Sequence, residues 1–340
     1  MSRRVSVGVQ GVAFFFLQMV SLWCASPFAA VAQTGDPPPS RVAECEVIIE
    51  QEHALGNGER TFSLPITVMR KDDGSYLLVE VAAQTVLQAY DAQGAPSFQF
   101  TGGEISDFGP IPLIHAWPGD SIAAWDPIRG RVLIYDAALR GPRVLEPVPL
   151  VRRAVKPLDG NLIVNADIRT PERAGLKLHA LDSLGRITTS FDGTNRYRRS
   201  ESRAHVRNLA LAARGGIWSH NSVENLIIRW SSEGRALQTI ALHDTWPDGL
   251  RIGAIQVVSL VEDDAGLWIL AHVSEADGSL STQVSVLDSV TGDAIASGSI
   301  DTVILGWVES RLGYSFDGVG DGTGRVTIWR PDLRCDENFP

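Results

Sequence analysis

A turn followed by a short apolar strand recurs six times, and this repeat constrains the fold more than any other feature of the chain. The glycines of the turns are separated by 45, 41, 56, 50 and 47 residues. These glycines are Gly74, Gly119, Gly160, Gly216, Gly266 and Gly313. A second strand follows each copy and closes on an aromatic residue or leucine, at intervals of 45, 46, 49, 57 and 42 residues. Two markers that share one period indicate a true internal repeat.

Each repeat contains about four short strands with alternating polarity, bounded by Gly, Asp and Pro, and no sustained helical period. The span from Cys45 to Cys335 holds 291 residues, which gives about 48 residues for each of six units. Units of 40 to 50 residues with four strands are typical of propeller blades. We therefore predict an all-β fold, a six-bladed β-propeller with four-stranded blades, over residues 43–336, followed by a C-terminal tail at 337–340.

The last repeat supplies only three strands before the chain ends, and the segment Glu46–Glu50 has the pattern of the missing one. We expect this N-terminal strand to complete the last blade, which would remove an open sheet edge. The same pairing would bring Cys45 close to Cys335, so we predict a disulfide between them. The alternative is two unrelated buried thiols.

The first 32 residues have the pattern of a secretory signal peptide. Arg3 and Arg4 precede an apolar stretch of about 13 residues, and Ala30-Val31-Ala32 forms a small-x-small cleavage site. Cys24 could mark a lipoprotein, but it follows a tryptophan rather than a small residue. Residues 33–42 are a Pro-rich linker. No later segment is long and apolar enough to span a bilayer, so we predict a periplasmic or secreted protein.

The charge of the chain argues against nucleic acid as a partner. Its formal net charge is −10, and it becomes −12 once the two arginines of the signal segment are removed. Binding to phosphates requires an excess of Lys and Arg, which this chain lacks. We expect a partner in the cell envelope: a protein, a peptide or an acidic glycan.

Residues 60–145 resemble the exported six-bladed propellers of bacteria that are related to the NHL-repeat group. The matching pattern runs from YDAQG through a Gly-containing loop that ends in Phe and Pro, then a GDSI strand, then RVLIYD. The loop TGGEISDFGPIP departs from the glycine- and proline-rich form of that group. The resemblance implies a propeller fold and export, but it brings no catalytic motif, and the fold does not determine the function.

Candidate ligand-binding residues lie in the loops that join the second and third strands of each unit, because such loops converge on one face of a propeller. They are Asp126, Arg129, Asp167, Arg169, His220, Asn221, His272, Glu275, Asp317 and Asp321. Three of them, Asp126, Asp167 and Asp317, could hold Ca²⁺ or another divalent cation through carboxylate oxygens. The alternative is that these residues merely form turns, and otherwise we expect no cofactor.

A basic segment, Asn195–Arg207, is the one local charge anomaly in this acidic chain. Guanidinium groups bind carboxylates, sulfates and phosphates, so the segment could contact an acidic glycan, or it could be a solvated loop. Its candidate residues are Arg196, Arg198, Arg199 and Arg203. Trp246 is a candidate for stacking on a sugar or peptide, with a loop anchor as the alternative.

No sequence motif for nucleophilic, zinc-dependent or phosphate-transfer chemistry is present. This favours a non-enzymatic binding module that presents its loop face to a protein, peptide or glycan. The alternative is a metal-dependent hydrolase or lactonase-like enzyme with carboxylates at the mouth of the axial channel.

Overall fold

A computed structural model of the chain separates an N-terminal segment, Met1–Val42, from a folded body, Ala43–Pro340. The residues that it describes are 45–58, 62–63, 65–71, 73–81, 85–100, 113–117, 121–126, 131–136, 143–145, 151–157, 160–168, 170–193, 206–221, 224–242, 255–274, 278–309, 311–318 and 323–335. The predicted signal peptide, linker and C-terminal tail lie outside these residues. Within them, no helix has the length and apolar character needed to cross a membrane.

The described part of the body contains four sheets of four antiparallel strands, and in each the spatial order follows the chain. The first comprises β3 (Pro65–Arg70), β4 (Tyr76–Val81), β5 (Thr85–Tyr90) and β6 (Pro96–Phe100), and the second β7 (Leu113–Trp117), β8 (Ser121–Asp126), β9 (Arg131–Tyr135) and β10 (Arg143–Leu145). The third comprises β11 (Val151–Val155), β12 (Leu162–Ala166), β13 (Leu176–Leu181) and β14 (Ile187–Gly193), and the fourth β15 (Arg207–Leu211), β16 (Ile217–Asn221), β17 (Leu226–Trp230) and β18 (Ala236–Ala241).

The remaining strands form one nine-stranded sheet, in the order β19-β20-β21-β22-β1-β25-β24-β23, with β2 also paired to β25. They are β19 (Ile255–Asp263), β20 (Gly266–Ser274), β21 (Leu280–Leu287), β22 (Ala294–Ile300), β23 (Ile304–Glu309), β24 (Leu312–Gly318), β25 (Thr323–Cys335), β1 (Cys45–Ala54) and β2 (Phe62–Ser63). A short 3₁₀ helix, η2 (Leu55–Gly58), follows β1. The prediction of six separate four-stranded sheets is thus corrected to four such sheets and one larger one.

The N-terminal strand is the reason for this difference, because β1 is hydrogen-bonded along both of its edges. It pairs antiparallel with β25 from Cys45↔Cys335 to Ala54↔Thr327, so the predicted pairing of the two chain ends is confirmed. It also pairs in parallel with β22, where Cys45 and Glu46 face Ala296 and Ser297. The predicted disulfide joins Cys45 to Cys335.

Three of the outer hairpins, β5–β6, β13–β14 and β21–β22, close on turns whose first residue is aspartate. Asp91 Oδ1 accepts hydrogen bonds from the backbone N–H of Gln93 (3.0 Å) and Ala95 (2.8 Å). Asp182 and Asp288 bind the backbone N–H groups of their own turns in the same manner. Such Asx turns satisfy backbone donors locally and fix the hairpin register. The repeated aspartates of the sequence are therefore structural residues.

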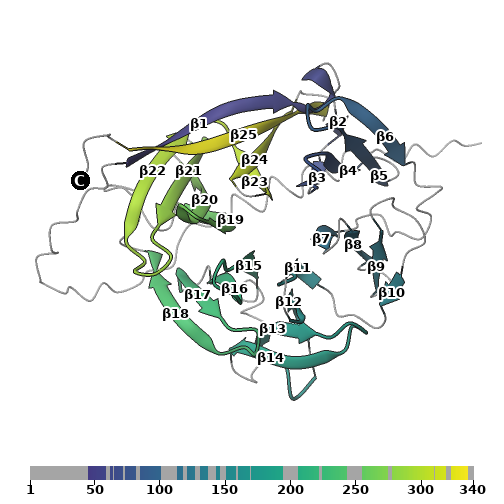
Figure 1. Cartoon of the computed structure of the whole chain (residues 1–340), viewed down its shortest axis with the longest axis vertical. Helices are drawn as coiled ribbons and strands as arrows, with labels where there is room; N and C mark the ends of the chain where they lie inside the picture. Colours follow the sequence, from purple (N-terminus) through teal and green to yellow (C-terminus); the bar gives the residue numbers. More distant parts are fainter. Residues whose placement is uncertain are drawn as a thin grey trace, which may run out of the picture. The chain divides into compact units, whose positions relative to one another are not determined.

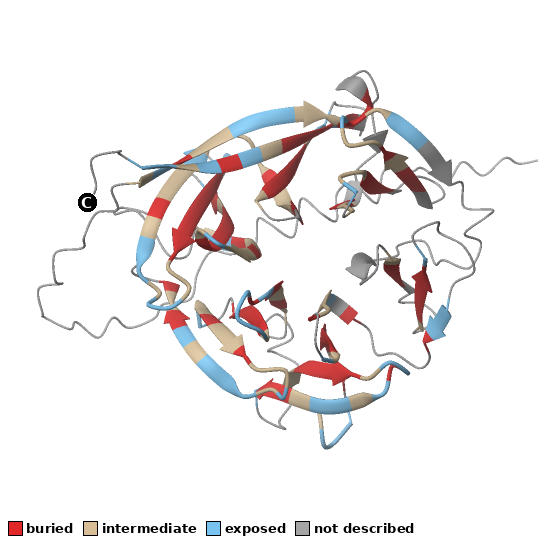
Figure 2. Cartoon of the chain, in the orientation of Figure 1, coloured by how far each residue is buried: buried red, intermediate tan, exposed pale blue. Residues whose placement is uncertain are grey.

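The sheets follow one another around a ring in a propeller-like arrangement (Figure 1). The first strands of the repeats, β3, β7, β11, β15, β19 and β23, each contact the next, and β23 contacts β3. Apolar clusters fill the space between neighbouring sheets, as between β15–β18 and β19–β21. Every residue of β12 and of β16 is buried, because both faces of these strands pack on adjacent sheets. The outermost strands, such as β18, keep exposed residues (Figure 2).

Candidate functional site

Polar residues gather where the second strand of a sheet ends and the first strand of the next sheet begins. Asn165 near the end of β12 accepts a hydrogen bond through Oδ1 from the backbone N–H of Arg207, the first residue of β15 (3.1 Å). In the nine-stranded sheet, His272 near the end of β20 places Nε2 2.7 Å from the carbonyl oxygen of Ile304, the first residue of β23. The repeated topology therefore brings these groups to one end of the ring, which we call the loop end.

A buried ion pair lies at this end, between the third and fourth sheets. The Arg207 side chain is fully buried, and its Nε donates to Asp192 Oδ2 at 2.5 Å. Asp192 has a φ of 63°, a left-handed conformation that costs a non-glycine residue about 1 kcal/mol or more. Buried charges are stable only when they are paired and hydrogen-bonded. The pair thus fixes the polypeptide on each side of the connection between the two sheets.

His220, near the end of β16, is the least satisfied polar group of the loop end. It is 2% exposed, and neither of its ring nitrogens has a hydrogen-bond partner in the described part of the chain. Burial lowers the pKa of His220 to about 4, and the charge of Arg207 acts in the same direction. A side-chain interaction with Asn225 opposes the shift. The imidazole is therefore neutral at pH 7, with an acceptor and a donor unused.

Two other histidines, one buried and one half-buried, show how unusual this is. His179 places Nδ1 2.8 Å from Ser190 Oγ and Nε2 3.3 Å from the carbonyl oxygen of Ala166. Burial lowers the pKa of His179 to about 4, as in His220, and His272 has its bond to Ile304. Buried polar atoms without a partner are rare in proteins and call for an explanation.

Asn221, the neighbour of His220, is occupied by its own turn. Its Nδ2 donates to Glu224 Oε2 at 2.7 Å, and its Oδ1 accepts from the Glu224 N–H at 3.3 Å. The structure thus brings His220 and Asn221 to the loop end in different roles, the first with unused hydrogen-bonding groups and the second as part of the β16–β17 turn. Arg207 ends the basic segment noted in the sequence, but its burial and its pairing with Asp192 were not expected. Its signal was a charge at the start of an otherwise apolar strand.

Many of the predicted site residues cannot be placed. Outside the described residues lie Arg129, Arg169, Arg196, Arg198, Arg199, Arg203, Trp246, Glu275 and Asp321. Asp126 is the last residue of β8, but its side chain is also outside them. Asp167 directly follows β12 and is half-buried, whereas Asp317 in β24 is exposed. Within the described residues, no three His, Cys, Asp or Glu side chains are grouped as they would be to hold a metal ion.

Comparisons with known proteins agree on the fold alone. No protein-family model matches the chain, and no curated protein matches it. Among solved structures, a candidate exported protein of Bacteroides fragilis is 12% identical, with a TM-score of 0.56, covering 88% of this chain and 98% of that one. A DUF4221 family member from Bacteroides vulgatus is 9% identical, with a TM-score of 0.52, covering 86% of this chain and 99% of that one.

An enzyme also has this fold. A catalytically inactive variant of virginiamycin B lyase from Staphylococcus aureus, solved with quinupristin, is 10% identical with a TM-score of 0.50, and the match covers 84% of this chain and 99% of the lyase. Proteins with the same fold thus include both a candidate exported protein and a lyase. The function of this chain must be argued from its own residues.

Proposed function

We propose that this chain is an exported, non-enzymatic binding module that takes a polar group of a protein, peptide or glycan ligand at the loop end. The observation that carries the proposal is His220, whose two ring nitrogens are buried with no hydrogen-bond partner among the residues that the structure describes. An unsatisfied buried polar group costs about 1–3 kcal/mol of folding free energy. A ligand hydroxyl, amide or carboxylate that bonds to the ring would recover this cost, and the recovered free energy would contribute to affinity.

The surroundings of His220 support a binding role. The ion pair of Arg207 and Asp192 ties β15 to β14, and sites on rigid elements position a ligand better than mobile loops do. Because the ring is 2% exposed, only a small group inserted from the ligand can reach it. An inserted serine, asparagine or sugar hydroxyl is of the right size.

We further propose that the ring is a six-bladed propeller of the NHL-like kind. The closed circuit of contacts among the six first strands supports this interpretation. On this interpretation, β19–β22 form one blade, and β23–β25 with β1 form another. The two parallel residue pairs between β1 and β22 then join two blades into one nine-stranded sheet.

We also propose that the chain is exported through a cleaved signal peptide and acts in the periplasm or outside the cell. The Cys45–Cys335 disulfide supports this location, because such bonds persist in oxidising compartments. Mass spectrometry of the exported protein should find a mature chain that begins at Gln33. An intact N-terminus on protein from the cell exterior would contradict cleavage.

A thermal-shift screen of residues 33–340 tests the binding function. Acidic sugars, neutral sugars and peptides are the probes, because a ligand that binds only the native state raises its melting temperature. We expect at least one class to raise the melting temperature of the wild type and to lose this effect in His220→Leu, while His179→Leu retains it. A shift of equal size in His220→Leu would contradict the proposed site. If mass spectrometry of the probe shows that the protein has converted it into a product, the chain is instead an enzyme.

A further inference from the structure

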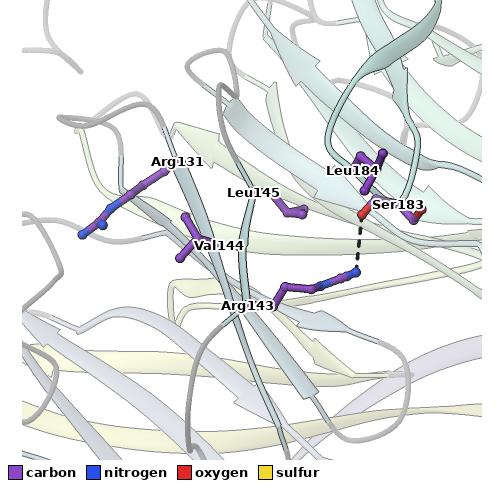
Figure 3. A pocket seen from close by; sticks show the side chains of 6 residues that line it. All are labelled: Arg131, Arg143, Val144, Leu145, Ser183 and Leu184. Atoms are coloured by element: carbon purple, nitrogen blue, oxygen red, sulfur yellow. Dashed lines mark hydrogen bonds between the residues drawn. The ribbon is translucent and has the colours of Figure 1, made fainter.

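A pocket of about 560 Å³ lies between the outer strands of the second sheet and a turn of the third. Strand β10 forms one wall, with Arg143, Val144 and Leu145, and the β13–β14 turn of the next sheet forms the other, with Ser183 and Leu184 (Figure 3). Arg131 of β9 completes the lining. Val144 and Leu184 are 46% and 59% exposed, two of the most exposed large apolar side chains in the described chain.

The charge of this pocket is opposite to that of the chain. Two of its six lining residues are arginines and none is acidic, whereas the whole chain has a net charge of −10. Guanidinium groups bind carboxylates through paired, charge-assisted hydrogen bonds. Arg143 is exposed, and its Nη1 donates a long hydrogen bond to the Ser183 carbonyl oxygen at 3.4 Å. A ligand carboxylate can replace so long a contact at little cost.

The backbone of β10 is also available to a partner. β10 has three residues and is the terminal strand of its sheet, paired to β9 alone among the described strands. The outer edge of such a strand presents N–H and C=O groups that an added strand can pair with. The pocket therefore combines a strand edge, exposed apolar side chains and positive charge.

The register fixes the spacing of the two arginines. Arg143 and Leu145 of β10 lie opposite Ile134 and Val132 of β9, and Leu145 and Val132 belong to the cluster that packs against the third sheet. Arg143 shares this face, because side chains alternate along a strand. Arg131 lies one residue before Val132 and therefore belongs to the other face of the sheet. Because Arg143 lies opposite Ile134, Arg131 is displaced from it by three residue positions along the strand direction. Figure 3 shows the two side chains pointing in opposite directions.

We propose that the β10 edge binds an extended acidic segment of another protein, with two carboxylates three residues apart and apolar residues between them. In an added strand, side chains three residues apart point to opposite faces. One carboxylate then meets Arg143 and the other meets Arg131, while an apolar side chain covers Val144 or Leu184. This site uses none of the residues around His220 and does not depend on His220.

Fluorescence polarisation with the exported chain, residues 33–340, tests the proposal. The probe is a labelled peptide with Glu at positions i and i+3 and Val between them, and its matched control has Gln at both positions. We expect the Glu peptide to bind at least about 10-fold more tightly than the Gln peptide, as a charge-assisted pair implies. Arg143→Ala should weaken binding of the Glu peptide by about 10-fold, and Arg235→Ala, at an exposed turn of the fourth sheet, should not.

Two further measurements make the result decisive. N-methylation of alternate peptide amides should abolish binding if the peptide pairs with β10 as a strand, and unchanged binding would overturn strand addition. Equal affinities of the Glu and Gln peptides, or of the wild type and Arg143→Ala, would overturn the charge-based recognition. Sedimentation that shows self-association of the wild type, lost in Arg143→Glu, would overturn the proposed partner in favour of a second copy of the chain.

Discussion

At the scale of single residues, the contrast between His220 and His179 makes a direct prediction about stability. Both side chains are buried, but among the described residues His179 bonds through both ring nitrogens and His220 through neither. Replacing an unsatisfied polar group by an apolar one of similar size removes a desolvation cost. We expect His220→Leu to raise the free energy of unfolding by about 1 kcal/mol, and His179→Leu to lower it by about 1–2 kcal/mol.

Urea denaturation of the two variants and the wild type measures this difference. Loss of stability in His220→Leu as large as that in His179→Leu would mean that His220 is bonded in solution. A gain would fit a residue kept for binding at the expense of stability, a common property of functional sites.

The same histidines predict how stability depends on pH. The pKa of each is about 4 in the folded protein and about 6.5 when unfolded. Above pH 6.5 neither state binds the proton, so the contribution is constant. Between pH 6.5 and 4 the unfolded state binds more protons, so stability falls as the pH falls. We expect each histidine to account for a loss of about 3 kcal/mol across this window.

Unfolding free energies measured by urea at pH 7, 6, 5 and 4 test this expectation. The slope should be smaller in His220→Leu than in the wild type, because one of the buried histidines that titrate in this window is gone. An identical slope in the two proteins would contradict the depressed pKa of His220.

At the scale of elements, the β15–β16 turn contains two adjacent glycines that have similar φ angles but differ in the atoms around them. Gly215 has a φ of 83° and Gly216 a φ of 82°, a region that disfavours other residues. A Cβ on Gly215 would meet nothing within 4 Å, whereas one on Gly216 would overlap the carbonyl oxygen of Trp230. We expect Gly215→Ala to lower the free energy of unfolding by about 1–2 kcal/mol, because of backbone strain alone. Gly216→Ala should lower it by at least about 2 kcal/mol more, because the backbone must also move to relieve the overlap.

Thermal unfolding of both alanine variants checks this expectation, with Gly215→Ala as the control for backbone strain. Equal losses would show that the contact with Trp230 relaxes at no cost. The comparison separates the two roles of a turn glycine, its backbone conformation and its lack of a side chain.

The strands and their turns were predictable because their signals are local. Asp91, Asp182 and Asp288 open hairpins through bonds within five residues, and the fully buried strands appear in the sequence as short apolar runs. The ion pair of Arg207 and Asp192 was not predictable, because its partners come from different sheets and the basic segment that ends at Arg207 gives no sign of which acid it meets. Which groups lie near the His220 ring depends on the three-dimensional packing of the sheets. The spacing of residues along the sequence does not encode this packing.

At the scale of the whole molecule, the closing of the ring was predictable in part. A missing strand and two terminal cysteines indicated that β1 would pair with β25, and it does. The parallel bridge from β1 to β22 was not indicated, because it involves only Cys45 and Glu46 and leaves no pattern in the sequence. Two residue pairs thus decide whether the last sheets are separate or continuous.

This closure predicts that the disulfide stabilises the whole body. The bond joins residues 290 positions apart, so its removal increases the conformational entropy of nearly the entire unfolded chain. We expect this to lower the free energy of unfolding by about 2–5 kcal/mol. We expect Cys45→Ser, Cys335→Ser and the double variant to lose the same amount in urea denaturation, because each breaks one bond. The ten residues of β1 keep their pairing with β25, so the variants should still fold. Amide hydrogen exchange in these variants should be faster than in the wild type, first in β1 and in the C-terminal end of β25. Unchanged exchange in these strands would show that strand pairing alone closes the ring.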